Sequence, residues 1–296
     1  MQNMIQCRLP QFLLAIALST PFAAQPLLAQ EGKRADNARN IPKTQASAPS
    51  KPPDTTIKLR DPNDPREGDI QVVGDQQIIK ATTLQQELAA LESHSKTVTL
   101  HTKKDNKLLA VAAPSANRSL HFPSAYLLGR TPYKVTERWM PLYVISERIH
   151  YQLDDEQFPG REEVWLTTMQ TWKKAHGDCE DHAILLADWL IEMGLDARVV
   201  LGTHGDNGHA WVIVFHDGDE YLLEATRKRF LERWASYSLA SMLPQYHPEM
   251  MFNRDDLWVN SGSKLTTSYS GKQWKKALHF SPDAQDGTSR ANLTTR

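Results

Sequence analysis

The sequence predicts an α+β fold, in which a helix that begins near Cys179 packs on an antiparallel sheet. A run of strong helix formers from Ala183 to Met193 follows this cysteine and ends at Gly194. Asp217-Gly218 is a tight-turn signal between two strand-like segments, and such a turn makes its flanking strands antiparallel. The strand-like segments are residues 197–201, 209–215 and 221–225.

The composition is that of a globular protein. Of 296 residues, 40% are hydrophobic and 23% are charged, and 34 basic side chains stand against 35 acidic ones, for a net charge of -1. This balance gives no chain-wide attraction to nucleic acid or to an anionic membrane. A mean hydropathy of -0.51, with no apolar run near the roughly 20 residues of a membrane span, excludes a multispanning protein.

Residues 1–29 have the pattern of a cleaved signal peptide. Arg8 precedes the apolar run 12–18, and the small pair Ala23-Ala24 follows it. The run is too short to favour the alternative of an uncleaved anchor. We therefore expect a periplasmic or secreted protein without stable membrane insertion. Its two cysteines are Cys7 and Cys179, and loss of Cys7 with the leader would leave one thiol and no intramolecular disulfide.

Four further segments follow the leader. Residues 30–66 are rich in Pro, Ser and Thr and predict a disordered linker, and residues 281–296 predict a disordered tail. Residues 67–132 are expected to form an accessory N-terminal region, with strands at 70–73, 98–100 and 108–111 and a helix over 83–93. Residues 133–280 are expected to form the catalytic domain, beginning with a helical spacing of apolar residues over 142–153.

Cys179, His209 and Glu224 are the candidate catalytic residues. The dipole and backbone N–H groups at a helix N-terminus favour a thiolate and can bind an oxyanion, so this position suits Cys179 as a nucleophile. A hairpin closed at Asp217-Gly218 could bring His209 and Glu224 to facing positions on adjacent strands. The imidazole would then generate the thiolate and protonate the leaving amine, while the carboxylate fixes its tautomer.

Three segments in this order resemble a known superfamily. They are Gly177-Asp178-Cys179-Glu180-Asp181-His182-Ala183, Gly208-His209-Ala210-Trp211-Val212 and Tyr221-Leu222-Leu223-Glu224-Ala225-Thr226. Over roughly residues 136–260 the chain resembles the transglutaminase-like superfamily of papain-type cysteine enzymes, most of all its bacterial transglutaminase-like cysteine proteinases, some of which are periplasmic and cleave surface adhesins.

The resemblance implies a role for each catalytic candidate. Cys179 would be the nucleophile, His209 the general base and acid, and Glu224 the orienting carboxylate. The family usually has aspartate at the third position. Glutamate is longer by one methylene, so its strand would have to lie slightly farther from the imidazole.

The resemblance also implies further site residues. Asp178 and Glu180 resemble a calcium site that some of these proteinases carry beside the nucleophile, and hard carboxylate oxygens suit that ion. Trp165 is a candidate for shaping the cleft or donating to the oxyanion.

The spacings Cys179-x2-His182 and His204-x4-His209 loosely imitate zinc ligands, so a structural zinc site is an alternative.

We expect an exported protease or amidase that acts on peptide or carboxamide bonds through a thioester. No cofactor is required by this chemistry, apart from the calcium considered above, and the expected partner is a protein or peptide substrate in the cell envelope. Two alternatives stay open: a transglutaminase that cross-links proteins, and a non-catalytic cell-surface scaffold with a vestigial triad. The sequence does not choose between water and an amine as acceptor, because that depends on how the cleft excludes water.

Overall fold

A computed structural model describes residues 61–73, 78–82, 98–101, 108–227 and 237–283. All of these except Asp61 belong to one folded unit. The expected leader, nearly all of the expected linker, the expected helix over 83–93 and most of the expected tail lie outside the described residues.

The helices of the described residues come in four α-helices and two short 3₁₀ turns. They are η1 (Pro123–Tyr126), α2 (Met140–Arg148), α3 (Asp154–Gln157), α4 (Thr168–Lys174), α5 (Cys179–Glu192) and η2 (Ala240–Met242). The strands are β1 (Gly68–Val72), β2 (Ile78–Ile79), β3 (Val98–His101), β4 (Leu108–Pro114), β5 (Leu120–His121), β6 (His150–Tyr151), β7 (His176–Gly177), β8 (Asp196–His204), β9 (Asn207–His216), β10 (Asp219–Leu223), β11 (Ser238–Leu239), β12 (Tyr246–Phe252), β13 (Asp256–Asn260) and β14 (Trp274–Pro282).

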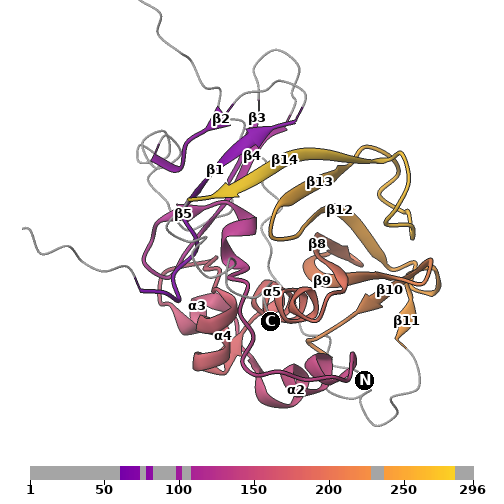
Figure 1. Ribbon diagram of the computed structural model, residues 1–296, viewed down its shortest axis with the longest axis horizontal. Helices are drawn as coiled ribbons and strands as arrows, with labels where there is room; N and C mark the ends of the chain where they lie inside the picture. Colours follow the sequence, from indigo (N-terminus) through magenta and orange to yellow (C-terminus); the bar gives the residue numbers. More distant parts are fainter. Residues whose placement is uncertain (1–60, 74–77, 83–97, 102–107, 228–236, 284–296) are drawn as a thin grey trace, which may run out of the picture. The chain divides into compact units, whose positions relative to one another are not determined.

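A large antiparallel sheet dominates the described part of the chain. Its strand order is β11-β10-β9-β8-β12-β13-β14-β1-β2, and each neighbouring pair is antiparallel. The prediction of helices combined with an antiparallel sheet is confirmed. Figure 1 shows β14 between β13 and β1, so the strand expected at 70–73 extends the main sheet.

The helix α5 packs against β8 and β9, next to α4 (Figure 1). Its residues from Cys179 to Leu190 are all buried, including the polar Glu180, Asp181, His182 and Asp188. Gly194, with φ +84°, follows its C-terminal end, a conformation that glycine adopts without steric cost. This confirms the helix that the sequence predicts after Cys179.

The strand β9 is buried on both faces. Ala210, Val212 and Val214 belong to the apolar cluster that includes α5. Trp211 and Ile213 alternate with them and belong to a second cluster on the other face of the sheet. This double burial explains the nearly continuous apolar run of the strand.

Three element boundaries differ from the predicted ones. The strands expected at 197–201 and 209–215 are longer and are joined by a two-residue turn, because β8 continues to His204 and β9 begins at Asn207. The helix expected through Leu153 ends at Arg148, where the chain turns extended and pairs as β6 with β7. The third strand of the core ends at Leu223, which leaves Glu224 just beyond it.

No helix of the described residues is both long enough and apolar enough to cross a membrane.

Candidate active site

Cys179 is the first residue of α5 and is fully buried. Asp178 precedes it with non-helical dihedral angles, φ -97° and ψ -149°. Gly177 allows the chain to enter the helix here, since a Cβ atom at this residue would lie 2.5 Å from the Cβ atom of Asp181. The position at a helix N-terminus is the one that the sequence predicts.

The surroundings and bonding of the Cys179 sulfur bear on its reactivity. Its Sγ atom lies 3.3 Å from Oε2 of Glu180. Cys179 is disulfide-bonded in this structure. Thiol chemistry at this residue therefore requires the reduced form.

His209 and Glu224 are in direct contact. The distance from Nε2 of His209 to Oε2 of Glu224 is 2.6 Å, and both side chains are 10% exposed. The ring of His209 also stacks on Trp211 at 6.1 Å and lies 5.8 Å from the ring of His204. The contact with Glu224 uses Nε2, so the imidazole has Nδ1 for proton exchange with another group.

Glu224 reaches this histidine from beyond the end of its strand. The last pair of the β9–β10 ladder is Leu223 with Val212, and an extension of this register places Thr226 opposite His209. Glu224 is thus in a diagonal position, two residues before the directly facing one, and diagonal neighbours lie farther apart than directly opposed residues. The extra methylene of glutamate suits this longer reach.

Glu224 is held as a buried carboxylate. Burial by itself raises its pKa, but the charge of His209 and hydrogen bonds from His209 and Thr226 lower the pKa to about 2. Oε1 accepts from the backbone N–H of Thr226 at 3.1 Å and from its hydroxyl at 2.6 Å. Tyr246 donates its hydroxyl to Oε2 at 3.1 Å. The carboxylate is therefore ionised and fixed at both oxygens.

The N-terminus of α5 lies in the electrostatic range of His209. Burial raises the pKa of Asp178, the residue before Cys179, to about 6. A hydrogen bond with Glu180, backbone hydrogen bonding and the charge of His209 lower this pKa but do not outweigh burial. Cys179 also belongs to the same buried cluster as Ala210 and Leu223, which adjoin His209 and Glu224 in the sequence.

Buried carboxylates surround the start of α5. Oxygen atoms of Asp154, Asp178 and Asp181 lie within 4.8 Å of one another, and the same holds for ligand atoms of Asp178, Cys179 and Glu180. Burial and the neighbouring carboxylates raise the pKa of Asp154 to about 11 and the pKa of Asp181 well above its usual value.

Four oxygens of this acidic cluster have no hydrogen-bond partner among the described residues. They are Oδ1 of Asp154, Oδ1 of Asp178, Oε1 of Glu180 and Oδ2 of Asp181. In two of these residues the other carboxylate oxygen accepts a hydrogen bond: Oδ2 of Asp154 from the N–H of Val164 at 2.5 Å, and Oδ1 of Asp181 from the N–H of Leu166 at 2.8 Å. Because unpartnered buried carboxylate oxygens are costly, the two groups of neighbouring ligand atoms fit a bound cation.

His182 is a buried residue of α5, three residues after Cys179. Its ring nitrogens lie 2.6 Å from the carbonyl oxygen of Asp178 and 3.2 Å from that of Ile149, and the ring stacks on Tyr151. The described groups that could hold a metal contain no pair of histidine and cysteine ligands. The zinc alternative therefore finds no support in this geometry.

Trp165 is a fully buried residue whose ring packs on Tyr126 and Phe252. Its indole N–H donates to Oε1 of Glu163 at 2.6 Å, and its ring stacks on Phe252. The indole has a single donor, so this bond leaves none for an oxyanion. The structure offers no support for the oxyanion or cleft role, which stays a prediction.

Sequence reasoning missed several residues of this site. Asp154 and Tyr246 lie far from the motifs in sequence, and no local pattern marks them. Asp181 was visible within the motif next to Glu180, and its spacing of one helical turn from Asp178 could have placed both carboxylates on one side of the helix start.

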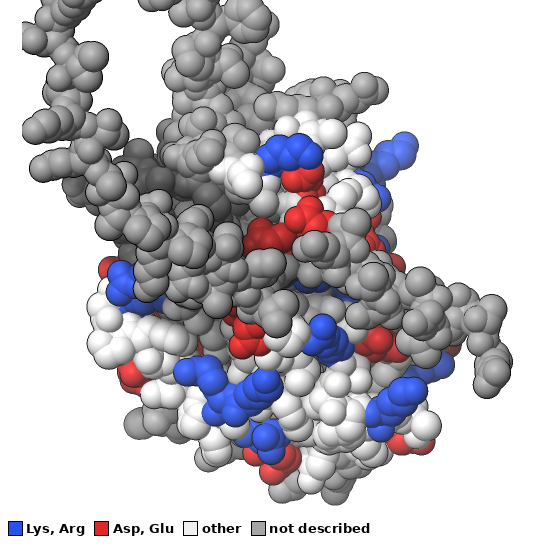
Figure 2. Space-filling view, turned by 60° about the vertical axis from the view of Figure 1, so that its left-hand side comes forward, with Lys and Arg blue, Asp and Glu red and all other residues white. Residues whose placement is uncertain are grey.

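The charged side chains of the surface are mixed in sign. Figure 2 shows basic and acidic residues interspersed over the described part of one face, as the near-zero net charge leads one to expect. The expected protein or peptide partner and the absence of a nucleic-acid partner stay predictions.

Comparison with known proteins finds similarity to a peptidase-like domain. The family model of the CEP76 peptidase-like domain matches residues 163–276, which include Cys179, His209 and Glu224. Centrosomal protein of 76 kDa from Danio rerio is 40% identical over 91 residues, which are 30% of this chain and 14% of that protein. The protein of the same name from Homo sapiens is 44% identical over 55 residues, 18% of this chain and 8% of that one.

The chain therefore spans 14% or less of these curated relatives. Among solved structures, Legionella pneumophila LapG is similar in calcium-bound form, with 18% identity, a TM-score of 0.34 and coverage of 50% of this chain and 81% of that one. The EGTA-treated form gives a TM-score of 0.33 and coverage of 42% and 67%. These structural likenesses are too weak to carry an argument about mechanism.

The sequence relatives correct the expected localisation. They are centrosomal proteins, and this contradicts the expectation of a periplasmic or secreted protein. The expectation depended on one cation before a seven-residue apolar run and on a resemblance to periplasmic proteinases. A short apolar run of this kind is not specific to export, because any segment with a few adjacent apolar residues produces it.

Proposed function

We propose that the protein is a cysteine-dependent acyl-transfer enzyme, a protease or amidase that cleaves peptide or carboxamide bonds. Cys179 acts as the nucleophile, His209 as the general base and acid, and Glu224 as the orienting carboxylate. The observation that carries the proposal is the buried contact of 2.6 Å between Nε2 of His209 and Oε2 of Glu224, in the neighbourhood of a helix that begins at a cysteine. The match of a peptidase-like family over these residues supports it.

In the proposed reaction, Nδ1 of His209 takes the proton of the Cys179 thiol. The thiolate attacks the substrate carbonyl carbon, and backbone N–H groups at the start of α5 stabilise the oxyanion. The imidazolium then gives its proton to the leaving amine as the carbon–nitrogen bond breaks, which leaves a thioester on Cys179. A water molecule that has lost its proton to His209 attacks the thioester and releases the acid and the thiol.

Glu224 acts through His209 in each of these steps. Its ionised carboxylate holds the proton of the imidazole on Nε2, so that Nδ1 is the nitrogen available to the thiol. It also stabilises the imidazolium that each proton transfer creates. A low pKa keeps the carboxylate charged throughout, as this role requires.

We also propose that Asp154, Asp178, Glu180 and Asp181 hold a calcium ion. Their four unpartnered buried oxygens fit an oxygen-liganded divalent cation. Bound calcium would supply positive charge that offsets the repulsion among these carboxylates. The carboxylates themselves fix the entry into α5, because Asp181 also binds the backbone N–H of Leu166.

Alkylation of the thiol tests the activated cysteine. Reduced, desalted protein is treated with iodoacetamide from pH 5 to pH 9, beside His209→Ala and Cys179→Ala. We expect wild-type alkylation at neutral pH that depends on Cys179 and falls at least about tenfold in His209→Ala. Equal rates in wild type and His209→Ala would remove the activated thiolate, and with it this function.

Product analysis tests the reaction. Reduced wild type and Cys179→Ala are incubated with a proteome-derived peptide library, and new termini and isopeptide bonds are mapped by mass spectrometry. New termini that require Cys179 support hydrolysis. Isopeptide products without new termini would assign the protein to protein cross-linking, and no products of either kind would favour a binding scaffold.

A further inference from the structure

The carboxylate of Glu224 has more hydrogen-bond donors than its contact with His209 requires. Each oxygen accepts two hydrogen bonds, with His209 and Tyr246 on Oε2 and with the amide and hydroxyl of Thr226 on Oε1. The residue itself lies beyond the last paired residue of β10, so the strand ladder does not fix it directly. The direction of the carboxylate therefore depends on these donors.

Tyr246 is held firmly in the position from which it donates. It is the first residue of β12, pairs with His204 of β8, and is 1% exposed. Its ring lies 4.4 Å from that of His204 and 5.2 Å from that of Trp211. The indole of Trp211 is anchored in turn, because it donates to the hydroxyl of Tyr269 at 3.1 Å.

We propose that Tyr246 and Thr226 are positioning residues that aim Glu224 at His209 and so set the orientation and proton affinity of its imidazole. The inference rests on the function proposed above and names two further residues of that site. Thr226 fixes one oxygen of the longer glutamate and Tyr246 the other.

Tyr246 is a donor over the whole working range of pH. Burial and the neighbouring Glu224 carboxylate both raise the pKa of its phenol far above the usual value. Its hydrogen bond withdraws negative charge from Oε2, the oxygen that also faces His209. Without it, Oε2 attracts the proton of the imidazolium more strongly, so His209 should keep that proton to higher pH.

Other charged and titratable groups also lie near His209, and the variants used in the test must leave these groups unchanged. They are Asp178 at the start of α5, His204 at the end of β8 and Glu224 after β10. A test must therefore alter a hydroxyl group alone. Tyr246→Phe and Thr226→Val do this, because each removes one hydroxyl and keeps the approximate shape of the side chain.

The experiment measures the pH profile of Cys179 alkylation and, on a peptide substrate, kcat and KM. We expect Tyr246→Phe and Thr226→Val to lower kcat about tenfold with KM nearly unchanged, and to move the alkaline limb of the profile to higher pH. Tyr126→Phe is the matched control. Tyr126 is also a fully buried tyrosine, but its hydroxyl donates to the carbonyl oxygen of Ala113, so the profile of this variant should match that of wild type.

Comparison of the double variant Tyr246→Phe/Glu224→Gln with the single variant Glu224→Gln separates positioning from general packing. A residue that acts through the carboxylate should have no further effect on the profile once the carboxylate is gone. A wild-type profile in both Tyr246→Phe and Thr226→Val would overturn the inference, as would an equal shift in Tyr126→Phe. If Tyr246→Phe does not fold, the profile of Thr226→Val alone decides whether the inference holds.

The two proposals fail in different ways. Equal alkylation of wild type and His209→Ala would remove the proposed function and this inference with it. Alkylation that depends on His209 but is unchanged by loss of either hydroxyl would remove this inference alone.

Discussion

At the scale of single residues, Glu224 combines deep burial with a stable charge. Burial alone favours the neutral acid, but His209, Thr226 and Tyr246 surround the carboxylate with donors. Its folded pKa of about 2 lies below its usual 4.5. Ionisation of this group therefore stabilises the fold, and this contribution is complete above the unfolded pKa and is lost as the pH falls through the folded pKa.

The resulting prediction concerns acid unfolding. We expect the stability advantage of wild type over Glu224→Gln to shrink by about 3 kcal/mol between about pH 5 and about pH 2, because only wild type loses this ionised group. Urea unfolding at several pH values in this window measures the difference. Glu249→Gln, which changes a half-exposed glutamate paired with Lys264, should show almost no change with pH. A wild-type advantage that is constant over the window would contradict the prediction.

The residues that sequence analysis found are those that local pattern marks. Cys179 stands before a helix-forming run, and His209 and Glu224 flank a hairpin signal. Tyr246 follows Glu224 by 22 residues and reaches it only because β12 pairs with β8. Such long-range pairing has no signature in the segment itself, so its hydroxyl could not be assigned from the sequence.

At the scale of elements, the start of α5 concentrates acidic side chains at the positive end of a helix dipole. Glu180 and Asp181 lie in its first turn, where the dipole favours carboxylates. The dipole alone does not satisfy four unpartnered oxygens in the interior. A cation that binds there should therefore stabilise the helix start and the fold.

We expect calcium to raise the melting temperature at pH 7.5 relative to EGTA. Binding at 100 times the dissociation constant stabilises a protein by about 2.7 kcal/mol, or several degrees. Asp181→Asn keeps the acceptor for Leu166 but removes a charge, and should reduce the calcium effect by more than half. Asp206→Asn, in the exposed β8–β9 turn, should leave it intact. Equal melting temperatures of wild type in calcium and EGTA would contradict the proposed site.

The elements differ in how far the sequence predicts them. The strands β8, β9 and β10 and the helix α5 follow from their runs of apolar and β-branched residues. The end of α2 at Arg148 does not follow, because Ile149 and Leu153 keep a helical spacing while the chain leaves the helix to form β6. There, pairing with β7 prevails over local periodicity.

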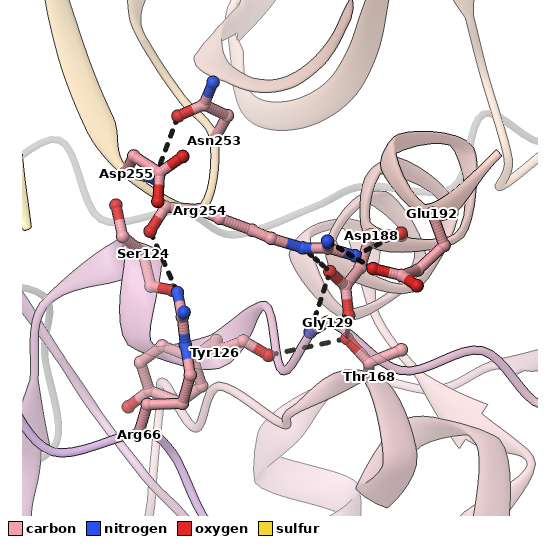
Figure 3. Close-up of polar contacts among 10 residues, drawn as sticks. All are labelled: Arg66, Ser124, Tyr126, Gly129, Thr168, Asp188, Glu192, Asn253, Arg254 and Asp255. Carbon is pink, nitrogen blue, oxygen red and sulfur yellow. Dashed lines mark hydrogen bonds and ion pairs between the residues drawn. The ribbon is translucent and has the colours of Figure 1, made fainter. Parts of the chain in front are cut away.

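At the scale of the whole described unit, one buried network joins segments that are distant in sequence (Figure 3). Arg254, in the β12–β13 turn, donates from Nε to Oδ1 of Asp188 at 2.6 Å and from Nη2 to the carbonyl oxygen of the same residue at 2.9 Å. It also pairs with Glu192. Asp188 accepts in addition from the N–H of Gly129 and the hydroxyl of Thr168.

The network extends to the beginning of the described chain. Arg66 donates from Nη2 to the carbonyl oxygens of Ser124 at 2.6 Å and Arg254 at 2.9 Å. Asn253 fixes the turn itself, because its Oδ1 atom accepts from the N–H groups of Asp255 and Asp256. The same network thus anchors α5, the β12–β13 turn and the segment before β1. No sequence pattern marks it, since its members are single polar residues in unrelated segments.

This network yields the last prediction, which concerns global stability. Arg254→Met should lower the free energy of unfolding by about 3 to 5 kcal/mol, because it leaves the fully buried carboxylate of Asp188 without its countercharge. Lys264→Met, which removes an exposed partner of Glu249, should cost at most about 1 kcal/mol. The double variant Arg254→Met/Asp188→Leu should recover part of the loss, because it removes the unpaired charge as well. Urea unfolding of the four proteins measures these differences, and an Arg254→Met cost no larger than that of Lys264→Met would show that the network does not support the fold.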